Sequence, residues 1–264
     1  MVNTVAFPSL QSVAEDWAQL LRGAERVTDH LPGSYDDEAL YAGYAAQERQ
    51  LLALLNCTDS PAYELMSTSW GQLAVSAMQP FSRGVVEARG PASVFPHNSA
   101  GDGDDEGGPL IDPRYCSHPF DCEVLVRGLE VNDRLVRTAP MAALGPVLPD
   151  EPGLREGEDD GDEDRDTLRR ETVHRLVRTE FHPSGTAAMM PPDRGGVVDT
   201  SLRVHGARNL RVVDAAVIPL IPDGHIQAAV YAIAEKVRPR FTHTIILSTY
   251  HSLPLPASSR MSYS

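Results

Sequence analysis

Apolar residues recur at every third or fourth position in five stretches of the chain, which places them on one face of a helix. Two acidic residues, Asp36 and Asp37, favour the start of one such helix through its dipole, and Pro119 suits the first turn of another. The helices predicted from this pattern span Ser12–Arg26, Asp36–Leu55, His118–Thr138, Asp166–Glu180 and Ile226–Val237.

Strand patterns lie between these helices. Gln72–Gln79 alternates apolar and polar residues, Pro80 interrupts the pattern, and Ser82–Arg89 resumes it. This arrangement predicts a β-hairpin or a sheet edge. Two further short β-prone pieces lie within Gly196–Val213, and Pro109–Tyr115 reads as an extended segment. The mixture of elements predicts an α/β (α+β) fold.

Composition narrows the possible partners. The apolar fraction of 42% is compatible with a globular core, and the formal net charge of −14 argues against a nucleic-acid partner, which would need a basic face. Much of the acidic excess falls in two predicted surface loops, Gly101–Gly107 and Glu156–Asp164, which we expect to be solvated. No run of 18 apolar residues occurs, so no membrane-spanning helix is predicted.

The three cysteines give no disulfide framework. Cys116 and His118, together with Cys122, are residue types that bind metals, but the sequence offers no evident fourth ligand. Ordinary part-buried thiols are therefore the favoured interpretation, and no metal site is predicted.

Two histidines stand at positions where chemistry is possible. His182 lies just past a predicted helix end and before a Pro-Ser-Gly-Thr turn, where it could act as a general base or be purely structural. His225 follows Asp223-Gly224 at the start of another predicted helix. The backbone N–H groups of His225, Ile226 and Gln227 could stabilise an anion there, although an ordinary helix cap is the simpler interpretation.

Taken together, three blocks resemble the carboxy-terminal signature of the glucose–methanol–choline (GMC) flavoprotein oxidoreductases. They are FHPSGTAAMM, GGVVDTSLRVHGARNLRVVDAAVIP and DGHIQAAVYAIAEK. The branch they resemble is the fungal one with aryl-alcohol and glucose oxidases, which suggests an alcohol of secondary metabolism. The resemblance extends over about Ser69 to Arg240.

The resemblance implies FAD as cofactor and a small-molecule alcohol as substrate. His182 would remove the hydroxyl proton while hydride leaves for the flavin, and His225 would assist it. Asp214-Ala215 match the family segment along the FAD pyrophosphate, with Ala216 where serine is common. The start of the last helix, His225, Ile226 and Gln227, would lie against the flavin.

The implied organisation is a partial GMC fold: a remnant of the FAD-binding domain plus an antiparallel-sheet substrate domain with helices. We expect a helical segment of weaker match at 1–68, the substrate-binding domain at 69–180, the FAD-domain part at 181–240, and an irregular tail at 241–264. No GxGxxG phosphate-binding turn occurs in these 264 residues. We therefore expect weak or no FAD binding by the chain alone.

Two alternatives stay open beside an alcohol-oxidising enzyme. Non-redox members of the family, such as cyclases and lyases, use the same histidines for acid–base chemistry. The chain could also be an inactive, truncated paralogue. Compartment, oligomeric state and the substrate's identity are not determined by the sequence.

Overall fold

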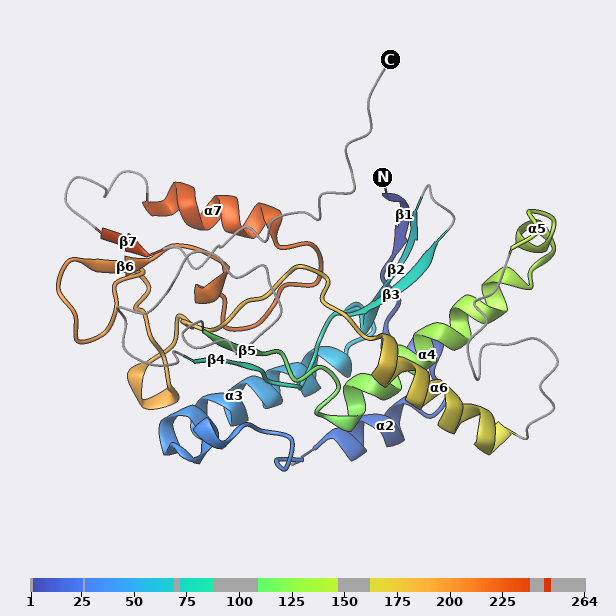
Figure 1. The fold of residues 1–264 in the computed structure, drawn as a ribbon, viewed down its shortest axis with the longest axis horizontal. Helices are drawn as coiled ribbons and strands as arrows, with labels where there is room; N and C mark the ends of the chain where they lie inside the picture. Colours follow the sequence, from blue (N-terminus) through green and yellow to red (C-terminus); the bar gives the residue numbers. More distant parts are fainter. Residues whose placement is uncertain are drawn as a thin grey trace, which may run out of the picture.

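The computed structural model describes residues 2–25, 27–68, 72–87, 109–146, 162–237 and 245–247 (Figure 1). The acidic segment Gly101–Gly107 lies outside this part, as does most of Glu156–Asp164. The helices are α1 (Leu10–Val13), α2 (Trp17–Ala24), α3 (Glu38–Leu55), α4 (Pro119–Val136), α5 (Ala139–Ala142), α6 (Asp162–Leu176) and α7 (Gln227–Val237). The strands are β1 (Val2–Ala6), β2 (Tyr63–Thr68), β3 (Leu73–Ala77), β4 (Val85–Glu87), β5 (Leu110–Asp112), β6 (Leu210–Val212) and β7 (Ile245–Leu247).

The strands form three small sheets. β1, β2 and β3 make an antiparallel sheet in that order, β4 pairs antiparallel with β5, and β6 pairs parallel with β7. The architecture is mixed α/β with antiparallel sheets, as predicted.

The predicted hairpin between the segments Gln72–Gln79 and Ser82–Arg89 is wrong, because β3 pairs with β2 and β4 pairs with β5. The other option, a sheet edge, is confirmed, since β3 is the outer strand of its sheet. β1 and β2 were not predicted at all. In β2 the consecutive residues Tyr63 and Glu64 are both buried, so the strand lacks the alternation by which a half-exposed strand is recognised.

Four predicted helices are confirmed to within a few residues, and two details differ. The helix expected at Ser12–Arg26 is divided into α1 and α2. The helix expected at Asp166–Glu180 ends at Leu176, so Val177–Glu180 form an irregular segment leading to His182. Within the predicted irregular tail, Ile245–Leu247 form β7 against β6.

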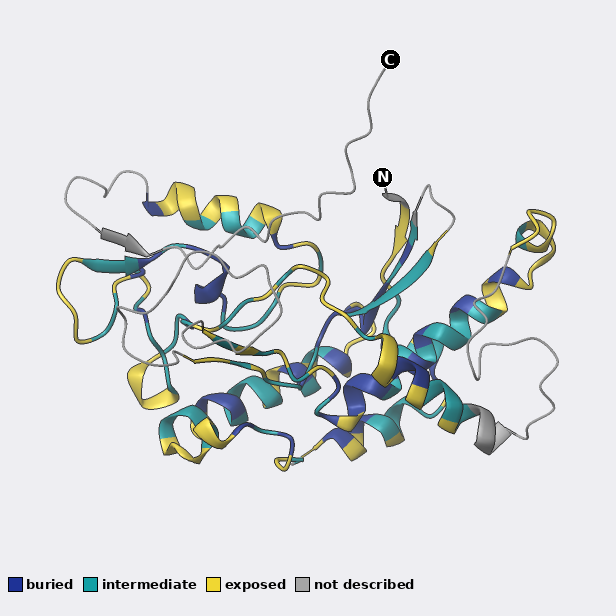
Figure 2. Ribbon diagram, in the orientation of Figure 1, coloured by how far each residue is buried: buried dark blue, intermediate teal, exposed yellow. Residues whose placement is uncertain are grey.

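The main core lies where α2, α3 and α4 meet the three-stranded sheet. Its buried side chains include Leu10, Leu51, Leu55, Tyr63, Phe81, Phe120 and Val124 (Figure 2). Burial of each large apolar side chain contributes about 1.5–3 kcal/mol. α4 approaches β3 closely, because a Cβ on Gly128 would lie 2.4 Å from Val75 Cγ1. This contact fixes the sheet that forms one wall of the site described below.

A second core is built largely from loops. The segment 185–189 runs beside Ala215–Val217, with N–H groups of Ala187 and Met189 donating to the carbonyls of Ala216 and Val217, both at 2.9 Å. Val198, Leu202, Val212 and Val237 are buried there. α7 covers this core with one face, and its other face is open, with Tyr231 67% exposed (Figure 2). In the described part of the chain no helix has both the length and the apolarity that a membrane crossing needs.

Candidate active site

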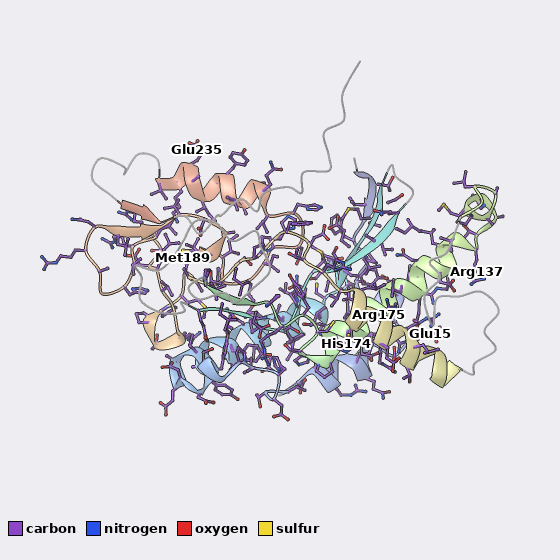
Figure 3. All side chains as sticks on the ribbon, viewed as in Figure 1. Glu15, Arg137, His174, Arg175, Met189 and Glu235 are labelled. Atoms are coloured by element: carbon purple, nitrogen blue, oxygen red, sulfur yellow. The ribbon has the colours of Figure 1, made fainter. Side chains whose placement is uncertain are left out.

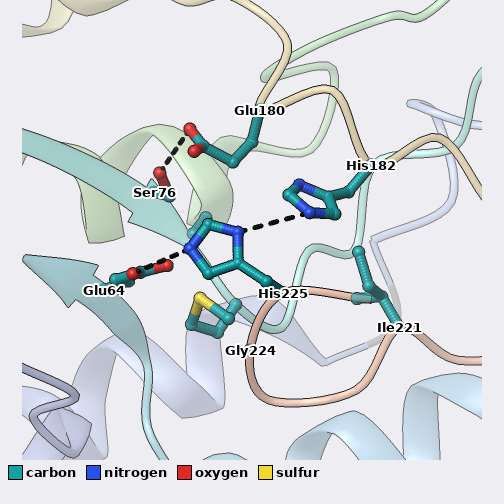
Figure 4. A pocket seen from close by; sticks show the side chains of 9 residues that line it. Glu64, Ser76, Glu180, His182, Ile221, Gly224 and His225 are labelled. Carbon is teal, nitrogen blue, oxygen red and sulfur yellow. Dashed lines mark hydrogen bonds and ion pairs between the residues drawn. The ribbon is translucent and has the colours of Figure 1, made fainter. Parts of the chain in front are cut away.

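Four separate segments enclose a small cavity of about 40 Å³ (Figure 4). β2 and β3 form one wall, the irregular segment after α6 forms the second, and the turn before α7 forms the third. The residues lining the cavity are Glu64, Ser76, Ala77, Met78, Glu180, His182, Ile221, Gly224 and His225. Both histidines singled out in the sequence therefore face the same cavity.

The two histidine rings are in direct contact. His225 Nδ1 lies 3.3 Å from His182 Nε2, and the ring centroids are 5.0 Å apart with planes inclined at 54° (Figure 4). The side chain of His225 is 45% exposed and His182 is half-buried. Solvent or a small ligand can therefore reach the rings from the cavity.

A buried carboxylate, Glu64, completes this arrangement and was missed in the sequence. Glu64 is 2% exposed, and its Oε1 lies 3.3 Å from His225 Nε2. The two atoms lie at ion-pair distance, and a hydrogen on His225 Nε2 would be directed toward this carboxylate. Glu64, His225 and His182 thus lie in contact in that order, although Glu64 Oε1 makes no hydrogen bond within the described part of the chain. The signal in the sequence was a single charged residue beside the apolar residues Leu65 and Met66 of this strand.

A second carboxylate flanks the array. Ser76 Oγ on β3 donates to Glu180 Oε2 at 2.8 Å. Because α6 ends at Leu176, Glu180 stands on the irregular segment after it and turns toward the cavity. Ligand-capable atoms of Glu180, His182 and His225 all lie within 4.8 Å of one another.

The turn that carries His225 is tied to the end of β3. Gln79 is 3% exposed, and its side-chain amide donates to the Asp223 carboxylate. Burial raises the pKa of Asp223, and the nearby Ser60 hydroxyl opposes this rise. Gly224 has φ of +151°, and a Cβ there would meet nothing within 4 Å, so the chain borders open space at this point.

The other residues predicted to bind the cofactor are Asp214 and Ala215 in a short helical turn, and Ile226 and Gln227 at the start of α7. Asp214 is 4% exposed, and its Oδ1 accepts from Ala216 N at 2.9 Å, which caps a short 3₁₀ helix at Ala215–Val217. Ala215 packs with Ile226 in a buried cluster, whereas Gln227 is exposed. The backbone N–H groups of His225, Ile226 and Gln227 find no acceptor among the residues that the structure describes. The geometry therefore leaves these donors available to an anion.

Comparison with known proteins settles the family. Residues 92–234, more than half of the chain, match the family model for the carboxy-terminal region of GMC oxidoreductases. The chain belongs to the GMC oxidoreductase family. The resemblance drawn from the three sequence blocks is confirmed. GMC oxidoreductases are FAD-dependent enzymes that act on alcohols.

The chain is similar to several fungal proteins. A glucose oxidase-like protein, fsoC, of Humicola fuscoatra is 40% identical over 132 residues, covering 48% of this chain and 21% of its own. Patulin synthase of Aspergillus clavatus is 36% identical, covering 64% of this chain and 24% of its own. The structure of a fungal aryl-alcohol oxidase superposes with a TM-score of 0.70 at 27% identity, over 89% of this chain and 37% of that one.

The chain thus spans between about a fifth and two fifths of the length of these relatives. The predicted link to fungal secondary metabolism agrees with a relative named for the synthesis of patulin. The roles predicted for individual residues stay predictions.

Proposed function

We propose that this chain carries the acid–base centre of a GMC oxidoreductase that oxidises the CH–OH group of a small alcohol. The observation that supports the proposal is the array of Glu64, His225 and His182 at the edge of a cavity, with two contacts of 3.3 Å. In this proposal His182 removes the hydroxyl proton and His225 hydrogen-bonds the same oxygen. General-base assistance of this kind contributes on the order of 10²–10⁴-fold.

Glu64 acts as a positioning residue in this proposal. Its carboxylate lies at ion-pair distance from His225 Nε2 and so favours one orientation of that ring. His225 Nδ1 then faces His182 Nε2, and an alcohol oxygen that replaces their direct contact would lie beside both nitrogens.

The residues at the start of α7 fit the cofactor of the family. Three N–H groups without acceptors among the described residues, beside open space at Gly224, suit an anionic group. FAD, when bound, supplies the hydride acceptor that alcohol oxidation requires. We infer that His225, Ile226 and Gln227 lie against it, and that Asp214-Ala215 support its pyrophosphate from beneath.

A non-redox function is the second candidate. The array of Glu64, His225 and His182 can move a proton to or from a substrate without any electron acceptor, as a cyclase or lyase requires. The two candidates differ in whether flavin is reduced during turnover.

The test uses the longest transcript that encodes this chain, with the chain alone beside it. Each protein is titrated with FAD and then mixed without oxygen with primary aliphatic, benzylic and sugar alcohols, while flavin absorbance is followed. The proposal predicts that one class bleaches the flavin, and that His182→Ala slows bleaching by about 10²–10⁴-fold. Weak FAD binding by the chain alone is also expected.

His205→Gln is the matched control, because this histidine contacts the Met190 carbonyl and does not line the cavity. Bleaching by His182→Ala at the wild-type rate would contradict the proposal. Product formation without flavin bleaching would instead support the non-redox candidate.

A further inference from the structure

Two cysteines and a histidine from three different segments meet on the side of the molecule formed by α4 and α6. Cys116 lies in the loop before α4, Cys122 in the first turn of α4, and His174 in the last turn of α6 (Figure 3 marks His174). Their two Sγ atoms and one imidazole nitrogen all lie within 4.8 Å of one another. None of these residues lines the cavity of the candidate active site.

The distances suit a single thiophilic ion. Tetrahedral Zn²⁺ binds sulfur at about 2.3 Å and imidazole nitrogen at about 2.0 Å, which places neighbouring ligand atoms about 3.5–3.8 Å apart. Side-chain rotations that move each of the three ligand atoms by about an ångström would bring them to those separations. The fourth position would face solvent beside the exposed His174, where water can complete the coordination.

The surroundings favour a neutral metal complex. Cys116 and Cys122 are 8% and 3% exposed and pack with Val126 and Val173. Two thiolates with Zn²⁺ and a neutral imidazole carry no net charge, so the complex avoids the cost of an isolated charge in apolar surroundings. The Cys116 backbone has φ of +56°, a rare conformation for a residue with a side chain.

His118 is the histidine that accompanies the two cysteines in the sequence, from which no metal site is predicted. His118 is fully buried, its Nδ1 accepts from Phe120 N at 3.1 Å, and its ring packs against Phe81 and His30. The third ligand is instead His174, which lies more than fifty residues farther along the chain. A thiol pair alone suits a disulfide equally well, and the imidazole within reach of both sulfurs separates the two possibilities.

We propose that Cys116, Cys122 and His174 bind one zinc(II) ion, with water as the fourth ligand, and that this ion fastens α6 to α4. Binding releases the two thiol protons to solvent and changes no oxidation state. The site is independent of the proposed oxidoreductase function. It would hold in place the helix from which the chain runs to Glu180 and His182.

The test starts from the full chain, purified with reductant and stripped of metal, then titrated with Zn²⁺ or with Co²⁺ as a visible reporter. We expect one tightly held ion per chain, and Co²⁺ spectra with thiolate charge-transfer bands and tetrahedral d–d bands. Cys116→Ser and Cys122→Ser should abolish both. His174→Gln should weaken binding by more than the ~10–100-fold that loss of an outer-shell partner costs. Cys57→Ser, an exposed thiol, is the matched control.

The two cysteine variants change buried side chains and could lose zinc because they misfold. His174→Gln avoids this problem, because the His174 side chain is exposed and its replacement should leave the fold intact. In the wild-type chain Zn²⁺ should also slow alkylation of Cys116 and Cys122 relative to Cys57, as read by mass spectrometry. Unchanged zinc affinity in His174→Gln would overturn the proposal. So would a Cys116–Cys122 disulfide in the chain isolated without reductant, together with no zinc retention after reduction.

Discussion

Two pairs of histidines occupy opposite environments in this molecule. His30 and His118 are 4% and 0% exposed, with ring centroids 4.6 Å apart and planes at 76°. His182 and His225 are similarly close, at 5.0 Å, but they border a cavity and contact a carboxylate. The residue type and the ring separation are nearly the same, so the surroundings decide what each pair can do.

Burial keeps the first pair uncharged. It lowers the pKa of His30 to about 4, with the neighbouring His118 adding to the effect. It also lowers the pKa of His118 to about 4, an effect that the nearby Ala24 backbone partly opposes. His118 uses its unprotonated Nδ1 to cap α4. This pair is therefore a structural element, whereas the cavity pair is open to a substrate.

The largest expected effect on stability comes from the buried pair. His118→Ala removes the α4 cap and leaves a cavity beside Phe81, so we expect a loss of about 3 kcal/mol in the free energy of unfolding. His182→Ala, on the half-buried side of the cavity, should change it by less than about 0.5 kcal/mol. Urea denaturation followed by circular dichroism measures both. Equal losses would remove the distinction between the pairs.

The pH dependence of stability sharpens the same comparison. Between the ordinary value of 6.5 and the folded value of about 4, the unfolded chain takes up protons on His30 and His118 that the folded chain does not. Stability should therefore fall as pH falls through this window, by on the order of 2–3 kcal/mol per histidine. Burial also raises the pKa of the adjacent Asp121, which contributes with the opposite sign.

Urea midpoints at pH 7, 6, 5 and 4 give this dependence, and His30→Gln should make it shallower. His182→Gln serves as the control and should leave the slope unchanged. An unaltered slope in His30→Gln would contradict the assignment of acid sensitivity to the buried pair.

A smaller effect, on catalytic efficiency, is expected from replacing Glu64, the carboxylate that contacts His225. Glu64→Gln keeps the size of the side chain but allows His225 to rotate, so we expect about a tenfold loss in kcat/KM, or about 1.4 kcal/mol. Most of the loss should be in kcat, because alignment of the ring matters at the step of proton transfer. Glu87→Gln on the exposed part of β4 is the matched control. A loss confined to KM would show that Glu64 serves substrate binding instead.

Local pattern predicted local structure well. The periodicity of Glu38–Leu55, Pro119–Val136 and Gln227–Val237 was sufficient for three long helices. Strand pairing was not predictable in the same way, because β3 and β4 select partners that lie elsewhere in the chain.

The candidate sites also divide into residues that local sequence patterns reveal and residues that only the fold brings together. His182 and His225 were found because each lies in a recognisable block, and the fold brings them together. Glu64 and His174 belong to no such block. Each becomes significant only through a neighbour that the fold supplies from a distant segment, so neither could be assigned a role from the sequence.

The central claim is that Glu64 holds His225 through its Nε2–H while His118 stays neutral in the core. The most direct test is a long-range ¹H–¹⁵N NMR spectrum of the chain with ¹⁵N-labelled histidine, recorded from pH 7 to pH 4. We predict a protonated Nε2 on His225 that changes environment in Glu64→Gln. We also predict a His118 ring that keeps an unprotonated Nδ1 down to about pH 4. An unprotonated Nε2 on His225, or a His118 ring that becomes charged near pH 6.5, its ordinary value, would contradict the account.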